Sequence, residues 1–578
     1  MWKTFYNQLG KYKTAAILAP IYTGLDVVMS ILIPYVTASI IDKGIMAGSM
    51  REVLYYGSIM VLLAILCLLF GFLAGRSAAF ASTGFGYNLR DAMYRRIQTY
   101  SFSNIDKFST ASLVTRMTTD VSRIQQATQM ILVMLVRAPL TLVTSIVMCL
   151  VINPGMSLIF VAAIVVLALG ITLIASRVIK LFSQVFKQYD QMNQAVQENV
   201  SAIREVKSYV HEEYETNKFN REARLLYDLS KKSEVLMANI SPMMMLVMNG
   251  TIIAISWFGA QFIVGGTLTT GELTSMLSYV MQVLISLMLL SVIFIIMTMS
   301  AAAAKRIVEV IKEEPDISNI GTDQQITVSD GSIGFNHVSF SYSPSGEYVL
   351  NDIHFIINAG ETIGIIGGTG CGKSTLVSLI ARLYDVTKGQ VMVGGNDVRS
   401  YDLTVLRHAV AMVPQKSTLF SGSVIENLRW GNPDATLKAC RDACRLACAD
   451  SFVEAMPQGY ETHIEQGGTN ISGGQRQRLC IARALLTQPN ILILDDATSA
   501  VDTTTDAKIR KALRETLPHT TKLIISQRVS SVQDTDRILV MDNGNVVAFD
   551  THERLMANNE TYQEIYASQA GGNADFDL

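Results

Sequence analysis

The chain has 578 residues, of which 49% are hydrophobic and 17% are charged, and its mean hydropathy is +0.31. Soluble proteins carry about 25% charged residues, so this composition excludes a disordered chain and argues against a wholly soluble one. The 47 basic and 49 acidic side chains leave no basic excess, and we expect no nucleic acid partner.

Six apolar stretches in the first half reach the roughly 20 residues that a helix needs to cross a bilayer. They lie at about 15–41, 54–80, 130–152, 156–179, 236–264 and 273–299. Lys and Arg gather in the long connections after the second and fourth spans, which places these connections and both termini in the cytoplasm. Both connections keep helical spacing, so we expect helices that extend beyond the bilayer. Residues 1–310 are thus predicted to form an all-α transmembrane domain.

Two ionisable residues lie deep within predicted spans. Asp26 in the first span and Arg137 in the third lie at a similar depth, when each is counted along its helix from the outer end. Because a charge within the membrane usually pairs with another charge or faces a cavity, we predict that Asp26 contacts Arg137. The pair is either a strut between spans or, alternatively, Asp26 serves a cationic substrate.

Composition changes after the sixth span, where charges return and Gly becomes frequent. We assign 311–330 to a linker, 331–568 to a second domain and 569–578 to a flexible tail. Strand-like runs separated by helical patterns predict an α/β domain with a largely parallel sheet. These runs lie at 333–342, 361–366, 390–393, 411–413, 491–494, 522–525 and 537–541.

A complete phosphate-binding loop follows the strand at 361–366 and precedes a helical segment. It reads Gly367, Gly368, Thr369, Gly370, Cys371, Gly372, Lys373 and Ser374, followed by Thr375. The glycines let backbone N–H groups surround phosphates, and the helix N-terminus adds its positive dipole end. We expect Lys373 to reach the β- and γ-phosphates and Ser374 to give an oxygen to Mg²⁺. Cys371 fills space within the loop.

Two further motifs follow in order along the chain. Ser472, Gly473, Gly474 and Gln475 open a predicted helix, and the apolar strand at 491–494 ends in Asp495. A carboxylate at this strand end is what a second Mg²⁺-holding group requires. With its Ser-Gly-Gly-Gln signature and its phosphate-binding loop, the chain resembles the ATP-binding cassette (ABC) family. The order of six spans and then a cassette resembles an ABC exporter half-transporter of the type IV fold.

The resemblance implies roles for further residues. Tyr342 matches the aromatic residue that stacks on adenine, and Gln415 matches the glutamine that senses Mg²⁺. ATP and Mg²⁺ are the implied cofactors, with Ser374, Gln415 and Asp495 as the metal-site residues. The resemblance also places two coupling helices, which rest on the cassettes, at about 103–108 and 210–218.

The chain departs from the family pattern at two positions. Asp496 stands where the family carries the general base Glu, and Gln527 stands where it carries the switch His. Asp is one methylene shorter than Glu, and Gln cannot carry the charge of His. We therefore expect this site to bind ATP and to hydrolyse it poorly, although neutral drift in an active homodimer is an alternative. The intact signature, Ser472 to Gln475, would complete the active site of a partner half-transporter that has the Glu and His.

The pattern as a whole is typical of one subunit of a bacterial heterodimeric multidrug exporter, with the cassette and both termini on the cytoplasmic side of the inner membrane. Its implied substrates are hydrophobic or amphiphilic small molecules reached through the membrane lipid. A lipid flippase and a nucleotide-gated regulatory subunit without catalysis of its own are alternatives. The intact signature argues against the regulatory alternative, because such a cassette need not complete a partner's site.

Overall fold

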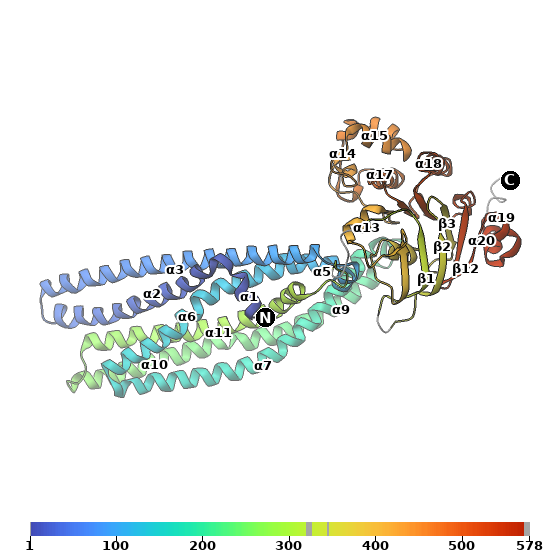
Figure 1. Ribbon diagram of the computed structural model, residues 1–578. Coiled ribbons are helices and arrows are strands. Elements are labelled where there is room, and N and C mark those ends of the chain that lie inside the picture. Colours follow the sequence, from blue (N-terminus) through green and yellow to red (C-terminus); the bar gives the residue numbers. More distant parts are fainter. Residues whose placement is uncertain (1, 320–325, 344–345, 571–578) are drawn as a thin grey trace. The chain divides into compact units, whose positions relative to one another are not determined.

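The computed structural model describes residues 2–319, 326–343 and 346–570 (Figure 1). The chain divides into two compact units. We call Met1–Gln98 with Ala111–Lys312 the membrane unit, and Thr99–Thr110 with Glu313–Leu578 the cassette unit. The segment Thr99–Thr110 therefore belongs with the cassette, although helices of the membrane unit precede and follow it. Parts of the expected linker (320–325) and tail (571–578) lie outside the described residues.

The membrane unit is built from long helices that run side by side and from a few short helices that connect them or precede them (Figure 1). They are α1 (Trp2–Gln8), α2 (Lys13–Ser39), α3 (Met50–Gln98), α5 (Thr110–Thr115), α6 (Val121–Ile152), α7 (Pro154–Ser201), α8 (Ile203–Ser208), α9 (Glu212–Ala238), α10 (Ile240–Val264) and α11 (Thr270–Lys312), with a 3-10 turn at Gly10–Tyr12 and π-helical turns at Ile40–Ile45 and Arg116–Asp120.

Within the described residues, six helical segments are long and apolar enough to cross a membrane, as the sequence predicts. They are Gly10–Ile45, Met50–Gln98, Thr110–Ile152, Pro154–Ser201, Glu212–Val264 and Thr270–Leu290. The 49 residues of α3 span about 74 Å at 1.5 Å per residue, more than twice the roughly 30 Å of a hydrocarbon core. The long connections are thus continuous with the spans, in agreement with their helical spacing.

The segment 210–218, where the resemblance places the second coupling helix, does not form a short helix of its own. α8 ends at Ser208, Val210 adopts a left-handed backbone conformation with φ of 56°, and α9 begins at Glu212. Three acidic residues in the first turn of α9 favour a helix start there, because they face the positive end of its dipole. The segment 210–218 is therefore a turn followed by the start of a long helix.

The predicted pairing of Asp26 with Arg137 is confirmed. Arg137 Nη2 lies 2.9 Å from Asp26 Oδ2 and joins α6 to α2. The side chain of Asp26 is 7% exposed, whereas that of Arg137 is 46% exposed. The buried Asp26 carboxylate on α2 is therefore compensated by a cation, which avoids the cost of an unpaired charge.

The cassette unit contains two main sheets. The six-stranded sheet has the order β12-β11-β3-β10-β9-β6, and all its pairs are parallel except β11 with β12. The four-stranded sheet has the antiparallel order β2-β1-β4-β5. The strands are β1 (Ile333–Phe340), β2 (Leu350–Ile357), β3 (Thr362–Gly367), β4 (Lys388–Val393), β5 (Asn396–Asp397), β6 (Val410–Val413), β9 (Ile491–Asp495), β10 (Thr521–Ile525), β11 (Arg537–Asp542) and β12 (Asn545–Asp550), and β7 (Gly422–Ser423) pairs with β8 (His463–Ile464).

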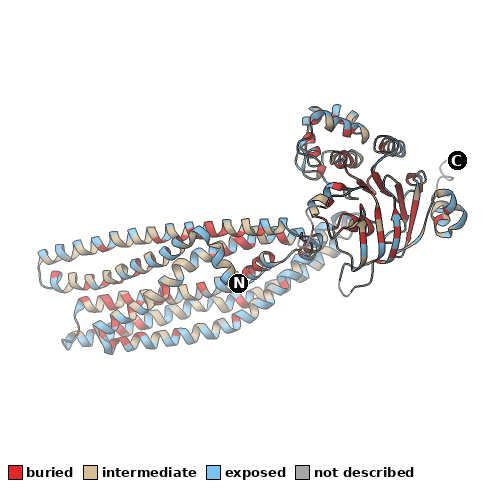
Figure 2. Cartoon of the chain, in the orientation of Figure 1, coloured by how far each residue is buried: buried red, intermediate tan, exposed pale blue. Residues whose placement is uncertain are grey.

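The central strands of the parallel sheet are buried on both faces, by helices on one face and by α12 together with the antiparallel sheet on the other (Figure 2). Along β9, Ile491 and Ile493 enter the core shared with β1 and α12, whereas Leu492 and Leu494 enter the core shared with α17. A strand buried on both faces is continuously apolar, which is why this run was recognisable. The helices are α4 (Phe102–Phe108), α12 (Lys373–Ile380), α13 (Leu403–Ala409), α14 (Val424–Leu428), α15 (Leu437–Leu446), α16 (Asp450–Glu454), α17 (Gly473–Leu485), α18 (Thr503–Thr516), α19 (His552–Asn558) and α20 (Glu560–Ala570).

Candidate functional site

The predicted site residues gather at one edge of the parallel sheet. Strands β3, β10, β9 and β6 are neighbours in that order, so their carboxyl ends share an edge. The phosphate-binding loop follows β3, Gln527 follows β10, Asp496 follows β9 and Gln415 follows β6. Ligands of open α/β sheets bind at the carboxyl ends of the strands. The topology thus brings together residues that lie far apart in the sequence.

The loop after β3 is shaped by its glycines and by Lys373. A Cβ at Gly367 would lie 2.2 Å from the carbonyl oxygen of Met541, so β11 leaves no room for a side chain there. Gly372 has φ of 98°, a conformation that glycine adopts without strain. Lys373 Nζ donates to the carbonyl oxygens of Gly367 at 2.8 Å and Gly368 at 2.7 Å. The ammonium group therefore lies within the loop, where it can meet an anion.

A hydroxyl and a carboxylate meet beside this loop. Ser374 Oγ donates to Asp495 Oδ1 at 3.1 Å, and Asp495 is only 5% exposed. Burial raises the pKa of Asp495, an effect that the hydrogen bond from Ser374 opposes. Both groups are the hard oxygen ligands that Mg²⁺ prefers.

The next carboxylate, Asp496, faces a different neighbour. Its backbone is left-handed, with φ of 49°, and its N–H donates to the Ile525 carbonyl oxygen at 3.0 Å. Its Oδ2 accepts from Gln415 Nε2 at 3.4 Å. The structure thus joins Asp496 to Gln415, two residues that the family resemblance implies for one site.

The Ser-Gly-Gly-Gln motif begins a helix and is fixed from two sides. Ser472 caps α17: its Oγ accepts from the Gln475 N–H at 3.2 Å, while Gln475 Oε1 accepts from the Ser472 N–H at 3.0 Å. A Cβ at Gly474 would lie 2.6 Å from the carbonyl oxygen of Ala500. The helix start is therefore packed against the loop that follows β9.

Comparison with known proteins identifies the family. A family model described as ABC transporter transmembrane region matches residues 17–288, and one described as ABC transporter matches residues 350–499. The uncharacterized ABC transporter ATP-binding protein YfiB of Bacillus subtilis is 34% identical over 566 residues, which cover 97% of this chain and 98% of that protein. The chain belongs to the ABC transporter family.

Two further comparisons extend this result. An ATP-dependent lipid A-core flippase of Syntrophus aciditrophicus is 33% identical over 482 residues, which cover 83% of this transporter and 80% of the flippase. A solved structure of a bacterial Atm1-family ABC exporter with ATP bound matches with a TM-score of 0.82 at 24% identity, over 97% of this chain and 99% of that chain. This transporter is accordingly a multi-pass membrane protein with the exporter fold, and its second unit is an ABC ATPase cassette.

The aromatic residue expected beside the nucleotide lies next to the phosphate-binding helix of the transporter. The Tyr342 hydroxyl is 2.9 Å from Thr375 Oγ1, and either group can donate. Its ring packs edge-on against Phe340 and Tyr384 and remains 54% exposed. An exposed aromatic face at this place can receive a planar base.

Gln527 is exposed, and its backbone carbonyl is hydrogen-bonded by a side chain of α20. Gln569 on α20 donates through Nε2 to the Gln527 carbonyl oxygen at 2.7 Å and accepts through Oε1 from the Val529 N–H at 2.8 Å. The sequence predicts a flexible tail over 569–578, but its first two residues, Gln569 and Ala570, belong to α20.

Sequence reasoning also missed Gln477 on the signature helix. Its Nε2 donates to Ser499 Oγ at 2.9 Å, and its Oε1 accepts from the Ala500 N–H at 2.9 Å. The side chain thus ties α17 to the loop after β9. A glutamine on the buried face of a predicted helix was the available signal, since a buried amide needs partners.

The membrane unit of the transporter holds a cavity of about 840 Å³ between α3, α6 and α11. Along α6 the lining changes from polar to apolar residues. The lining residues are Gly75, Arg123, Gln126, Ala127, Gln129, Met130, Val133, Met134, Ile296 and Ser300. Such a lining can hold a molecule with one polar and one apolar end. No separate pattern in the sequence indicates this cavity, because Arg123 is one of many basic residues in its connection.

Proposed function

We propose that this chain is one half of a heterodimeric ABC exporter that uses ATP to move amphiphilic small molecules out of a bacterial cell across the inner membrane. Its own phosphate-binding loop holds ATP at a site impaired for hydrolysis. Its signature helix completes the active site of a partner half-transporter. The Lys and Arg content of the long connections supports a cytoplasmic cassette.

The observation that carries this proposal is Asp496 at the position of the general base. A base must come within about 2.6–3.2 Å of the proton it abstracts, and Asp is shorter than Glu by about 1.5 Å. A misplacement of about 1 Å can slow a reaction about 100-fold. The Asp496 carboxylate accepts from Gln415, and Gln527 replaces a cationic switch residue. Both departures weaken hydrolysis and leave the phosphate-binding residues in place.

The signature residues support the second half of the proposal. Ser472 and Gln475 form a closed capping box, and Gly474 leaves α17 in close contact with Ala500. This helix start presents backbone N–H groups, which favour an anion such as a phosphate of the partner's nucleotide. On this proposal, the signature motif at the start of α17 serves the partner's ATP site, whereas this chain's own ATP site carries the replacements Asp496 and Gln527.

The residues at the sheet edge fit a nucleotide with Mg²⁺. Ser374 and Asp495 would hold the metal, Gln415 would approach it, and Lys373 would meet the phosphates. The described residues contain no group of three or more His, Cys, Asp or Glu side chains placed to hold a metal. Proteins often bind Mg²⁺ through one or two carboxylates and the substrate's phosphates. Bound Mg²⁺ would neutralise phosphate charge during transfer.

The cavity of the membrane unit supports an amphiphilic substrate. Its lining offers Arg123, Gln126 and Gln129 toward one end and Met130, Val133 and Met134 toward the other. A second candidate function, lipid translocation, is favoured by the relative from Syntrophus aciditrophicus, which bears the name lipid A-core flippase. Transport of a fluorescent cationic dye, compared with flipping of a fluorescent phospholipid in the same inside-out vesicles, separates the two.

The proposal is tested by isolating the tagged chain from its native membrane. We expect a second half-transporter, with Glu and His at the two altered positions, to co-purify, and the pair to hydrolyse ATP far faster than this chain alone. Lys373→Ala in this chain should leave most of the turnover of the pair, whereas Gly474→Ala should remove it. A chain that purifies alone and transports with full activity would refute the heterodimer.

A further inference from the structure

The short helix α4 is fixed within the cassette unit. Ser103 Oγ donates to Asp316 Oδ2 at 2.6 Å, and Asn104 Nδ2 donates to Glu313 Oε1 at 3.1 Å. Lys107 Nζ also meets the Glu313 carboxylate at 2.8 Å. α4 is thereby tied to the chain that follows α11, so a movement of α4 relative to the cassette would pull on this connection.

α4 also reaches a tyrosine of the cassette. The Tyr384 hydroxyl donates to Asp106 Oδ2 at 2.7 Å, and the rings of Tyr384 and Phe102 lie 6.0 Å apart. Burial and the hydrogen bond to Asp106 raise the pKa of Tyr384, so the phenol keeps its proton and donates at any physiological pH.

The same tyrosine contacts Tyr342, the residue expected to stack on adenine, which we call the adenine platform. The rings of Tyr384 and Tyr342 meet edge to face at 5.1 Å and 90°. Tyr342 in turn shares a 2.9 Å hydrogen bond with Thr375, the residue after the phosphate-binding loop. A continuous line of contacts therefore runs from α4 through Asp106, Tyr384 and Tyr342 to the nucleotide site.

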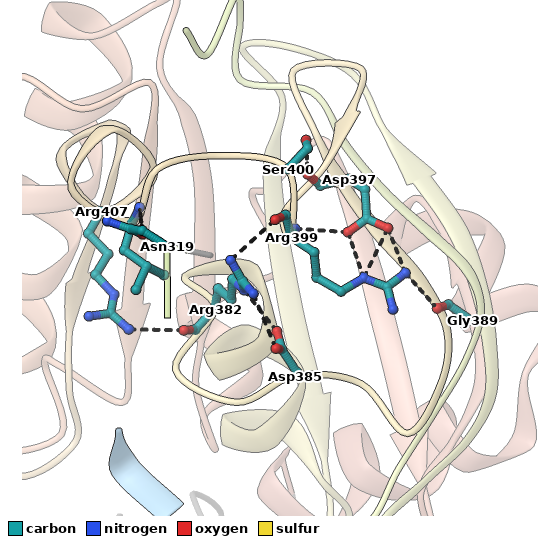
Figure 3. A network of polar contacts seen from close by, with 9 residues as sticks. Asn319, Arg382, Asp385, Gly389, Asp397, Arg399, Ser400 and Arg407 are labelled. Atoms are coloured by element: carbon teal, nitrogen blue, oxygen red, sulfur yellow. Dashed lines mark hydrogen bonds and ion pairs between the residues drawn. The ribbon is translucent and has the colours of Figure 1, made fainter. Parts of the chain in front are cut away.

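Polar contacts hold the residues on either side of Tyr384, Arg382 and Asp385 (Figure 3). Arg382 is buried, pairs with Asp385 at 2.9 Å and donates to the Arg399 carbonyl oxygen at 3.3 Å. The Arg382 carbonyl oxygen accepts from Arg407 at 3.0 Å, and burial lowers the pKa of Arg407. These contacts involve residues on both sides of Tyr384, so the backbone that carries this side chain is anchored within the cassette unit.

We infer that Tyr384 is a positioning residue. It couples binding of a base at the adenine platform to the strength of the contacts that hold α4 against the cassette. A base stacked on Tyr342 fixes that ring against the Tyr384 ring, and this in turn keeps the Tyr384 hydroxyl hydrogen-bonded to Asp106. By reciprocity, loss of the Tyr384–Asp106 hydrogen bond weakens the response of α4 to the base. The inference rests on the proposed ATP site and goes beyond it by naming the residue that transmits occupancy.

Hydrogen exchange of the α4 amides in the full chain, held in lipid nanodiscs, tests the inference. Each variant is measured without nucleotide, with saturating ATP and with inorganic tripolyphosphate, which has no base, and ATP binding is titrated separately. In the wild type, ATP should slow exchange of α4, whereas tripolyphosphate should not. Tyr384→Phe keeps the ring and removes the hydroxyl, so it should still bind ATP but lose most of the α4 response, by about fivefold or more.

Matched variants separate this role from general destabilisation. Asp106→Asn keeps an oxygen that accepts from Tyr384 and should keep the response, whereas Asp106→Ala should lose it. Tyr348→Phe removes an exposed phenol of the same unit and should respond like the wild type. An unchanged α4 response in Tyr384→Phe with ATP bound, or an equal response to tripolyphosphate, would overturn the inference. Failure of the wild type to bind ATP would instead refute the proposed site, and the inference with it.

Discussion

The ion pair between Asp26 and Arg137 offers a quantitative test of the membrane unit. Asp26→Asn keeps the size of the side chain and removes its charge, which leaves Arg137 without its carboxylate partner on α2. The matched control is Asp91→Asn on α3, where Asp91 pairs with Arg95 at 2.9 Å and the two side chains are 43% and 78% exposed.

The expected magnitudes follow from burial. Removing one partner of a fully buried ion pair costs about 3–5 kcal/mol, and an exposed pair contributes about 0.2–1 kcal/mol. Asp26 is 7% exposed and Arg137 is 46% exposed, so the cost falls between these limits, at about 2 kcal/mol. At about 2 °C per kcal/mol for a large domain, the melting temperature should fall by about 4 °C. The control should lower it by about 2 °C or less.

Thermal unfolding of the full chain in nanodiscs, followed by tryptophan fluorescence, measures these shifts. The double variant Asp26→Asn with Arg137→Gln should recover part of the loss, because it leaves no unpaired charge in the membrane. Equal shifts for Asp26→Asn and Asp91→Asn, or strictly additive effects in the double variant, would refute the argument that the pair is energetically coupled.

Three predictions concern the cassette. Lys373→Ala removes the ammonium group that lies against the loop carbonyls, so binding of a fluorescent ATP analogue to this chain should weaken at least about tenfold; unchanged affinity would contradict the assigned role. Gly474→Ala places a Cβ 2.6 Å from the Ala500 carbonyl oxygen, so ATP turnover by the complex with the partner should fall about 100-fold. ATP binding by this chain's own phosphate-binding loop should be kept. Equal losses of ATP turnover and ATP binding would point to unfolding instead. Burial raises the pKa of Asp495, so the charged carboxylate destabilises the fold as the pH rises through and above the ordinary Asp range. Asp495→Asn should therefore raise the melting temperature of the nucleotide-free chain at pH 7, and this gain should shrink toward pH 4. A gain that grows on acidification would contradict this sign.

Local patterns made much of the fold predictable. The apolar run at 491–494 is buried on both sheet faces, and such a run needs no knowledge of its neighbours to be recognised. The pairing of Asp26 with Arg137 followed from depth along two helices and from the cost of an unpaired charge. The phosphate-binding loop was predictable because its glycine spacing and its strand–loop–helix context occur within one short segment.

Other features depend on tertiary structure and were missed. Strand β2 alternates buried and exposed residues over Leu350–Ile357 and pairs with β1 in a separate antiparallel sheet, so no continuous apolar run marks it in the sequence. The break between α8 and α9 contains Val210 in a left-handed conformation, which a β-branched residue rarely adopts and which the sequence pattern does not indicate. Gln569 acts on Gln527 across a long sequence separation, and no local pattern indicates such a pair.

The central claim is that Asp496 and Gln527 impair hydrolysis at a site that still binds ATP. Steady-state ATP turnover of the purified chain alone, compared with the double variant Asp496→Glu with Gln527→His, tests it most directly. Lys373→Ala in both backgrounds reports the turnover of contaminating ATPases. We predict little turnover above that level in the wild type and a clear rise in the double variant. Rapid turnover by the wild-type chain that Lys373→Ala abolishes would contradict the claim and identify a self-sufficient homodimeric pump.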